Sequence, residues 1–273
     1  MPHLPIDDTE LYYEVAGEGT PLVMIRGVGS TLGQWFAQVP DFARGHRVVT
    51  FDNRGVGRSS RGSAAITAPR LAADVRALLA GLSALPAHVL GVSLGGMIAQ
   101  ELALSYPEAV RSLVLVATHC GGQDNEPTTP EAMAAFTRVV TGTATDPQAD
   151  LLSAMFAPGA AQRLPLVVAR YFHVSSLETA PPQVMQEQYQ AVRGFDACGR
   201  LPGLACPTLV LCGRQDGMIP PGNSRRLAGL IPGARLEMVD QAGHQVLLEQ
   251  AAPCNELVLE FLSQVDGGSA GVV

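Results

Sequence analysis

The chain has 273 residues and a formal net charge of −7, and all 18 of its basic residues are arginine. Because lysine is absent, the ordinary forms of Schiff-base and PLP enzymes, P-loop nucleotide hydrolases and protein kinases are excluded. The acidic balance argues against nucleic acid or an anionic membrane as a partner. One local basic cluster, Arg54, Arg58 and Arg61, is expected to lie in a solvated loop.

The expected strands and helices alternate along the chain. Residues 11–16 alternate in polarity, as in an exposed edge strand, and six short apolar runs are typical of buried parallel strands. Plausible helices separate these runs, so we expect an α/β protein with a mostly parallel central sheet and helices on both faces. The six runs are 22–26, 47–51, 87–92, 112–118, 207–212 and 235–239, and the helices are 69–84, 94–106, 221–231 and 247–265.

Between residues 119 and 200 this alternation stops. Four helical segments are expected there, at about 130–141, 147–156, 161–175 and 182–194, with no convincing strand among them. We interpret residues 119–200 as a helical insertion into a core made of residues 1–118 and 201–265, and residues 266–273 as a disordered tail.

Two features bear on where the protein resides. Five cysteines, an odd number with no CxxC pair, predict reduced thiols, and the acidic start of the chain lacks a signal-peptide pattern. Residues 77–100 carry no charge, but Pro86 and four glycines break that stretch, so we expect a helix end, a strand and a helix start there. These observations predict a cytoplasmic protein.

The strongest local signal is the G-x-S-x-G motif at Gly91–Gly95, which follows an expected strand and opens an Ala-rich helix. A serine on so sharp a turn needs neighbours without side chains, which Gly91 and Gly95 provide, while Gly96 lets the helix approach the sheet. Ser93 is therefore our candidate nucleophile.

A nucleophilic serine needs a histidine base and an orienting carboxylate, which follow in the order serine, acid, histidine. His244 comes just after the last expected strand and Asp216 just after the preceding one. We prefer Asp216 to Asp240 as the acid, because Asp240 lies close in sequence to His244 on the same strand exit. His119 and His173 are candidates to line a pocket.

The tetrahedral intermediates of acyl transfer need amide donors for the oxyanion. We expect one from the backbone N–H of Leu94, directly after the nucleophile. The other is expected from Val28, in the glycine loop after an early strand.

With these motifs, the chain resembles the α/β-hydrolase superfamily over nearly its whole length. Within it the chain resembles small serine esterases and lactonases of the 3-oxoadipate enol-lactonase type, and residues 119–200 then correspond to the helical cap. A serine nucleophile argues against haloalkane dehalogenases and epoxide hydrolases, which carry aspartate there. The matching segments are 26–29, 52–59, 91–96, 213–216 and 243–244.

One departure from the family pattern is Arg26, which stands where a histidine usually precedes the oxyanion-loop glycine. It either holds an anionic substrate or pairs with a nearby carboxylate, and we favour the pairing. For the substrate pocket we expect Arg26, Trp35, Phe136, Phe156 and Phe172. No metal site or cofactor is expected, because no His, Cys and carboxylate cluster has metal-site spacing.

The sequence therefore predicts a serine hydrolase that cleaves a carboxylic ester or lactone of a small organic molecule through an acyl-enzyme. Three alternatives stay open: C–C bond hydrolysis, acyl transfer with the same residues, and ligand binding without turnover. The expected partner is a small-molecule substrate, and a homo-oligomer is left open.

Overall fold

In residues 2–268, which this computed structural model describes, eight strands form one sheet in the order β1-β2-β4-β3-β5-β6-β7-β8. Strands β3 to β8 run parallel, while β2 is antiparallel to β4 and pairs with β1 in a hairpin. The strands are β1 (His3–Ile6), β2 (Thr9–Ala16), β3 (Thr20–Ile25), β4 (His46–Phe51), β5 (Ala87–Val92), β6 (Val110–Val116), β7 (Thr208–Gly213) and β8 (Arg235–Val239). The expected mostly parallel sheet is confirmed.

Both faces of the sheet are covered, which explains why the central strands are apolar along their whole length. Alternate residues of β3, for example, enter two different cores: Val23 packs on one face and Met24 on the other. The first core includes α2 (Ala68–Gly81), α3 (Leu94–Ser105) and α9 (Pro221–Leu230). The second includes α1 (Val39–Phe42), α10 (Val246–Glu249) and α11 (Ala251–Gly268).

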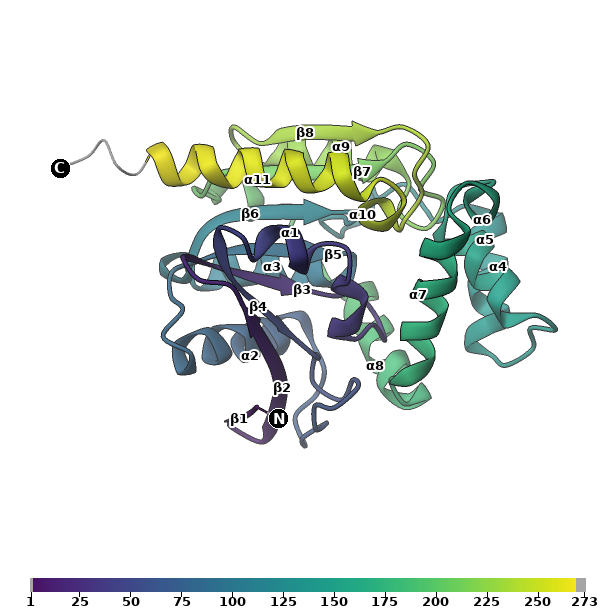
Figure 1. Cartoon of the computed structure of the whole chain (residues 1–273), viewed down its shortest axis with the longest axis horizontal. Coiled ribbons are helices and arrows are strands. Elements are labelled where there is room, and N and C mark those ends of the chain that lie inside the picture. Colours follow the sequence, from purple (N-terminus) through teal and green to yellow (C-terminus); the bar gives the residue numbers. More distant parts are fainter. Residues whose placement is uncertain (1, 269–273) are drawn as a thin grey trace.

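Between β6 and β7 the chain forms α4 (Pro130–Val140), α5 (Pro147–Met155), α6 (Ala160–Arg163), α7 (Pro165–Leu177) and α8 (Pro182–Arg193). We call residues 119–200 the cap; its helices lie beyond the carboxyl ends of the parallel strands (Figure 1). The helix expected at 161–175 is two helices, because Pro165 has no N–H for a continuing helix and instead opens α7.

The structure corrects the sequence interpretation at both ends of the chain. Strand β1 was not expected, because a four-residue segment containing a proline carries little strand signal. The tail expected from residue 266 is wrong for residues 266–268, since α11 continues to Gly268 and Asp266 bonds to His88 and Arg111. Residues 269–273 of that tail lie outside the described residues. Of the helices described, none is long and apolar enough to span a membrane.

Candidate active site

Ser93 alone makes the turn from β5 to α3, since the strand ends at Val92 and the helix begins at Leu94. Its backbone is left-handed, with φ 57° and ψ −121°, a conformation that is costly for a residue with a side chain. The turn is held by its neighbours: the Ser93 N–H donates to Val116 O at 3.0 Å, and the Thr118 hydroxyl donates to Ser93 O at 2.8 Å. The strained turn places Ser93 at the carboxyl end of the sheet.

The glycines around this turn allow a very close approach of backbone segments. A Cβ at Gly91 would lie 2.2 Å from Gly95 O, and one at Gly95 would lie 2.1 Å from Ile25 O. A Cβ at Gly96 would meet Thr118 at 2.6 Å. Each glycine is therefore required by contact with backbone or by the packing of α3 on the sheet.

His244 and Asp216 meet across 28 residues of sequence. The Nδ1 atom of His244 lies 2.9 Å from Oδ2 of Asp216, and both side chains are buried. The other carboxylate oxygen of Asp216 accepts hydrogen bonds from the N–H groups of Met218 and Ile219, each at 2.9 Å. Asp240 instead pairs with Arg214 at 2.7 Å, and its side chain is 81% exposed. The structure thus brings Asp216, and not Asp240, to the imidazole.

The cap fixes the loop that carries His244. Glu249 accepts from the N–H of Gly243 at 2.8 Å and from that of Ala157 in the cap at 2.9 Å. Gln245 N–H donates to Met155 O at 2.9 Å. Burial raises the pKa of Glu249, while these N–H donors oppose that shift. The imidazole is therefore held from both the core and the cap.

The loop after β3 lies directly against Ser93, as the oxyanion-hole hypothesis requires. A Cβ at Gly27 would be 3.0 Å from Cβ of Ser93 and 3.4 Å from its Oγ. In the described part of the chain, the N–H groups of Val28 and Leu94 donate no hydrogen bond, so both are free for an oxyanion. The neighbouring Gly29 N–H donates to Gln188 of α8 at 2.8 Å, which ties this loop to the cap.

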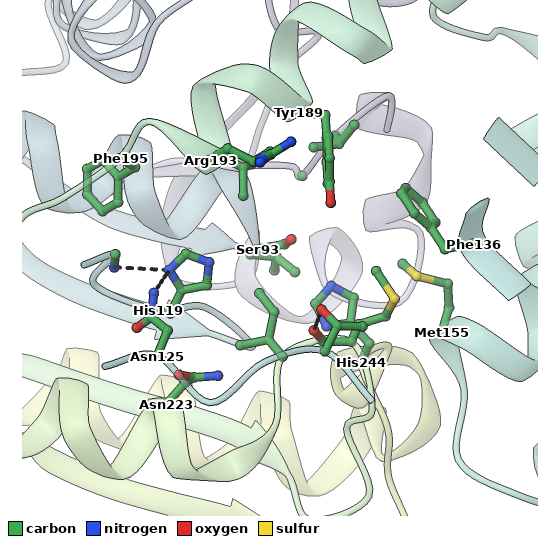
Figure 2. Close-up of a pocket in the computed structure, with 18 of the residues that line it drawn as sticks. Ser93, His119, Asn125, Phe136, Met155, Tyr189, Arg193, Phe195, Asn223 and His244 are labelled. Atoms are coloured by element: carbon green, nitrogen blue, oxygen red, sulfur yellow. Dashed lines mark hydrogen bonds between the residues drawn. The ribbon is translucent and has the colours of Figure 1, made fainter. Parts of the chain in front are cut away.

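A cavity of about 300 Å³ opens over Ser93 and His244, between the core and the cap. Figure 2 shows Ser93 in its middle, His119 and His244 on opposite sides, and Tyr189 and Arg193 of α8 facing it from the cap. Its wall also includes apolar side chains such as Phe136, Met155 and Ile219. A cavity of this size and mixed lining suits a small organic ligand.

Three of the expected pocket residues lie elsewhere. Trp35 is fully buried in the core between the sheet and α11, and Phe156 and Phe172 pack edge-on against Tyr171 within the cap. Arg26 and Phe136 do border the cavity, as expected. The sequence interpretation missed four residues that line the cavity: Asn125 in the loop before α4, Tyr189 and Arg193 on α8, and Asn223 in the first turn of α9. Their only signal in the sequence was a polar or aromatic side chain.

Arg26 is buried without a carboxylate partner among the described residues, so its expected pairing with a nearby carboxylate is wrong. Its Nη2 donates to Oε1 of Gln34 at 2.9 Å and of Gln245 at 3.4 Å, and its guanidinium lies 4.7 Å from the centre of the Trp35 ring. Nε has no partner. Burial lowers the pKa of Arg26 to about 10, which leaves the group charged at neutral pH.

His119 borders the cavity as a neutral imidazole. Its Nδ1 accepts from the Gly121 N–H at 3.0 Å and lies 3.2 Å from Nδ2 of Asn125, and burial lowers its pKa to about 4. A neutral ring whose Nδ1 accepts carries its proton on Nε2, the nitrogen turned toward the cavity (Figure 2). His119 can therefore donate a hydrogen bond to a ligand beside Ser93.

The cluster of Arg54, Arg58 and Arg61 is only partly the solvated loop that was expected. Arg54 is fully buried and pairs with Asp74 at 2.8 Å and Asp8 at 2.7 Å. Arg58 pairs with Glu178 at 2.9 Å and Arg61 with Glu187 at 2.6 Å, and both glutamates belong to the cap. Arg58 and Arg61 therefore fasten the cap to the core, while Arg54 pairs within the core.

The family model for the alpha/beta hydrolase fold matches residues 20–251. The chain belongs to this family. Among its relatives, RutD of Azorhizobium caulinodans, a candidate carbamate hydrolase, is 30% identical over 97% of this chain and 100% of its own. The 2-hydroxy-6-oxononadienedioate/2-hydroxy-6-oxononatrienedioate hydrolase 2 of Pseudomonas putida is 32% identical over 93% of this chain and 92% of its own.

The same architecture occurs in a solved enol-lactonase from Burkholderia xenovorans LB400. That structure superimposes with a TM-score of 0.83 at 27% identity and covers 96% of this chain and 100% of its own. The predicted resemblance to the superfamily, including an enol-lactonase, is confirmed. The relatives act on different bonds, so family membership makes this chain a hydrolase-fold protein without naming its substrate.

Proposed function

We propose that the chain hydrolyses carboxylic esters or lactones of small organic molecules through an acyl-enzyme on Ser93. One observation carries this proposal: the strained turn at Ser93 and the imidazole of His244, which is bonded to a carboxylate, border the same cavity. Ser93 and His244 both line that cavity, and Asp216 lies 2.9 Å from the far nitrogen of the imidazole.

In the proposed reaction, His244 Nε2 removes the proton from the Ser93 hydroxyl as its oxygen attacks the carbonyl carbon. Asp216 holds the imidazole with its proton on Nδ1 and stabilises the imidazolium. The N–H groups of Val28 and Leu94 donate to the oxyanion. His244 then protonates the leaving alkoxide, and a water molecule activated by the same imidazole hydrolyses the acyl-enzyme.

The decisive experiment uses Ser93→Ala with two readouts, hydrolysis of a short p-nitrophenyl ester and covalent labelling by a fluorophosphonate. Both should be lost, because each depends on the same oxygen, and the circular dichroism spectrum should stay that of the parent. Ser63→Ala, which removes an exposed hydroxyl that donates to Asp8 and does not line the cavity, is the matched control and should keep both activities. Full labelling of Ser93→Ala would refute the assignment.

C–C bond hydrolysis is the second candidate, and the P. putida relative favours it. The same serine, histidine and aspartate would serve, so the candidate site does not separate the two reactions. A panel of esters, lactones and β-diketones, each assayed against Ser93→Ala, separates them by the product released. Adding an alcohol or amine as acceptor tests acyl transfer in the same assay.

A further inference from the structure

Cys120 and Cys198 lie side by side where the cap joins the core. Cys120 belongs to the segment by which the chain enters the cap after β6, and Cys198 to the segment by which it leaves before β7. Their sulfur atoms are 2.8 Å apart, closer than a van der Waals contact between two sulfurs, although 78 residues separate them in sequence. Both are free thiols in this structure.

The backbone around the two cysteines is already paired. The Ala197 N–H donates to Cys120 O at 2.8 Å, and Gly121 and Asp196 form an isolated antiparallel bridge. Gly121 has φ 79°, and a Cβ there would lie 1.9 Å from Phe195 O, so only glycine permits this approach. The two segments are thus held in the register that brings the thiols together.

This junction forms one wall of the cavity. His119 and Gly121 on the first segment and Phe195 on the second line it, next to the two cysteines. Cys198 is half-buried and can be reached from solvent, whereas Cys120 is buried beneath it. A covalent bond between the sulfurs would join the two cap connections directly beside the proposed catalytic groups.

We propose that Cys120 and Cys198 are a site of reversible oxidation, at which a peroxide converts the thiol pair into a disulfide that fastens the base of the cap. In the first step, the sulfur of Cys198 attacks one oxygen of hydrogen peroxide, which breaks the O–O bond and yields a sulfenic acid and water. The sulfur of Cys120 then displaces the hydroxyl of that sulfenic acid, and a second water leaves. Two thiols and one peroxide thus give one disulfide and two waters, and an added dithiol reverses the change by exchange.

The groups around the thiols set the speed of this reaction. Burial, together with the neighbouring Cys120 and Asp196, raises the pKa of Cys198 to about 12, and the nearby Arg226 opposes that shift. Because the thiolate is the reactive form, oxidation should be slow at neutral pH and faster at pH 9. The contact between the sulfurs favours the second step over further oxidation of the sulfenic acid.

The absence of lysine makes the test simple, because trypsin then cuts this chain only after arginine. Cys120 falls alone in peptide 112–138 and Cys198 alone in peptide 194–200, while Cys206 and Cys212 share 201–214 and Cys254 lies in 236–273. The full-length protein is treated with hydrogen peroxide at pH 9, quenched, alkylated under denaturing conditions and digested. We expect peptides 112–138 and 194–200 joined, with a mass two hydrogens below their sum, and a thiol titre that falls from five to three.

Variants distinguish this outcome from general oxidation. Cys198→Ser should abolish the joined peptide, whereas Cys206→Ser, which removes another half-buried thiol, should keep it. After peroxide treatment, the parent and Cys206→Ser should unfold at a higher midpoint urea concentration than before it. The midpoint of Cys198→Ser should not rise. The proposal is overturned if Cys198 accumulates as sulfinic or sulfonic acid without the joined peptide, or if the disulfide joins Cys198 of two chains.

Discussion

Oδ2 of Asp216 lies 2.9 Å from Nδ1 of His244, while Asp240, only four residues before that histidine, points into solvent and pairs with Arg214. Sequence proximity and spatial proximity therefore give opposite answers for the orienting acid. Asp216 approaches because the loop after β7 lies beside the loop after β8, as neighbouring parallel strands require.

This relationship predicts different effects for two matched substitutions. Asp216→Asn should lower kcat for ester hydrolysis by about 10⁴-fold, because an amide can favour the wrong tautomer of the imidazole and does not stabilise its cation. Asp240→Asn should change kcat less than twofold, since the carboxylate it removes is exposed. Steady-state kinetics on one p-nitrophenyl ester measures both, and an equal loss in the two variants would contradict the geometry.

The glycine turn makes a prediction about stability. Gly95→Ala should lower the free energy of unfolding by about 3 kcal/mol, because its Cβ would collide with Ile25 O, a backbone atom that cannot move aside. Gly229 is the matched control: it lies within α9 and a Cβ there meets nothing within 4 Å. Gly229→Ala should stabilise by about 0.5–1 kcal/mol through helix propensity. Urea unfolding of both variants measures the difference, and a Gly95→Ala protein as stable as the parent would refute the packing argument.

Much of this site could be predicted from the sequence, because its main signals are local. A G-x-S-x-G between an apolar run and a helix indicates the strained turn at Ser93, and chain order then indicates Asp216 and His244. The pocket could not be predicted in the same way. The sequence indicates that Phe156 and Phe172 are apolar side chains of the cap, but not that their rings pack against Tyr171 instead of lining the cavity. The contact between Cys120 and Cys198 depends on the path of the chain through the whole cap and back to the core, which no local sequence pattern predicts.

His119 predicts how stability depends on pH. Its pKa is about 4 in the folded protein, against about 6.5 when unfolded, so between these values the unfolded chain binds a proton that the folded chain does not. The free energy of unfolding must therefore fall as the pH falls, by about 2 kcal/mol from this residue between pH 7 and pH 5. The buried His46 and His88, whose pKa values are also lowered by burial, add to the same trend.

The contribution of His119 to this pH dependence of stability can be isolated with His119→Gln, because the amide oxygen of glutamine can still accept from the Gly121 N–H. Urea unfolding at pH 7 and pH 5 should show a smaller loss of stability in this variant than in the parent. An identical loss in the two proteins would mean that His119 does not stay neutral in the folded state.

Arg26 could hold an anionic substrate or have a structural role, and one substitution separates these two roles. Arg26 is 2% exposed, and its guanidinium contacts two amide oxygens and Trp35 beside Gln245, the residue after His244. We therefore expect a structural role. Arg26→Met should lower the free energy of unfolding by about 2 kcal/mol, because it leaves Oε1 of Gln34 and of Gln245 without a charged donor. It should also lower kcat/KM by the same factor for p-nitrophenyl butyrate and for the carboxylate-bearing mono-p-nitrophenyl glutarate. These esters differ mainly in charge, so a selective rise in KM for the glutarate ester would show instead that Arg26 holds the anionic end of a substrate.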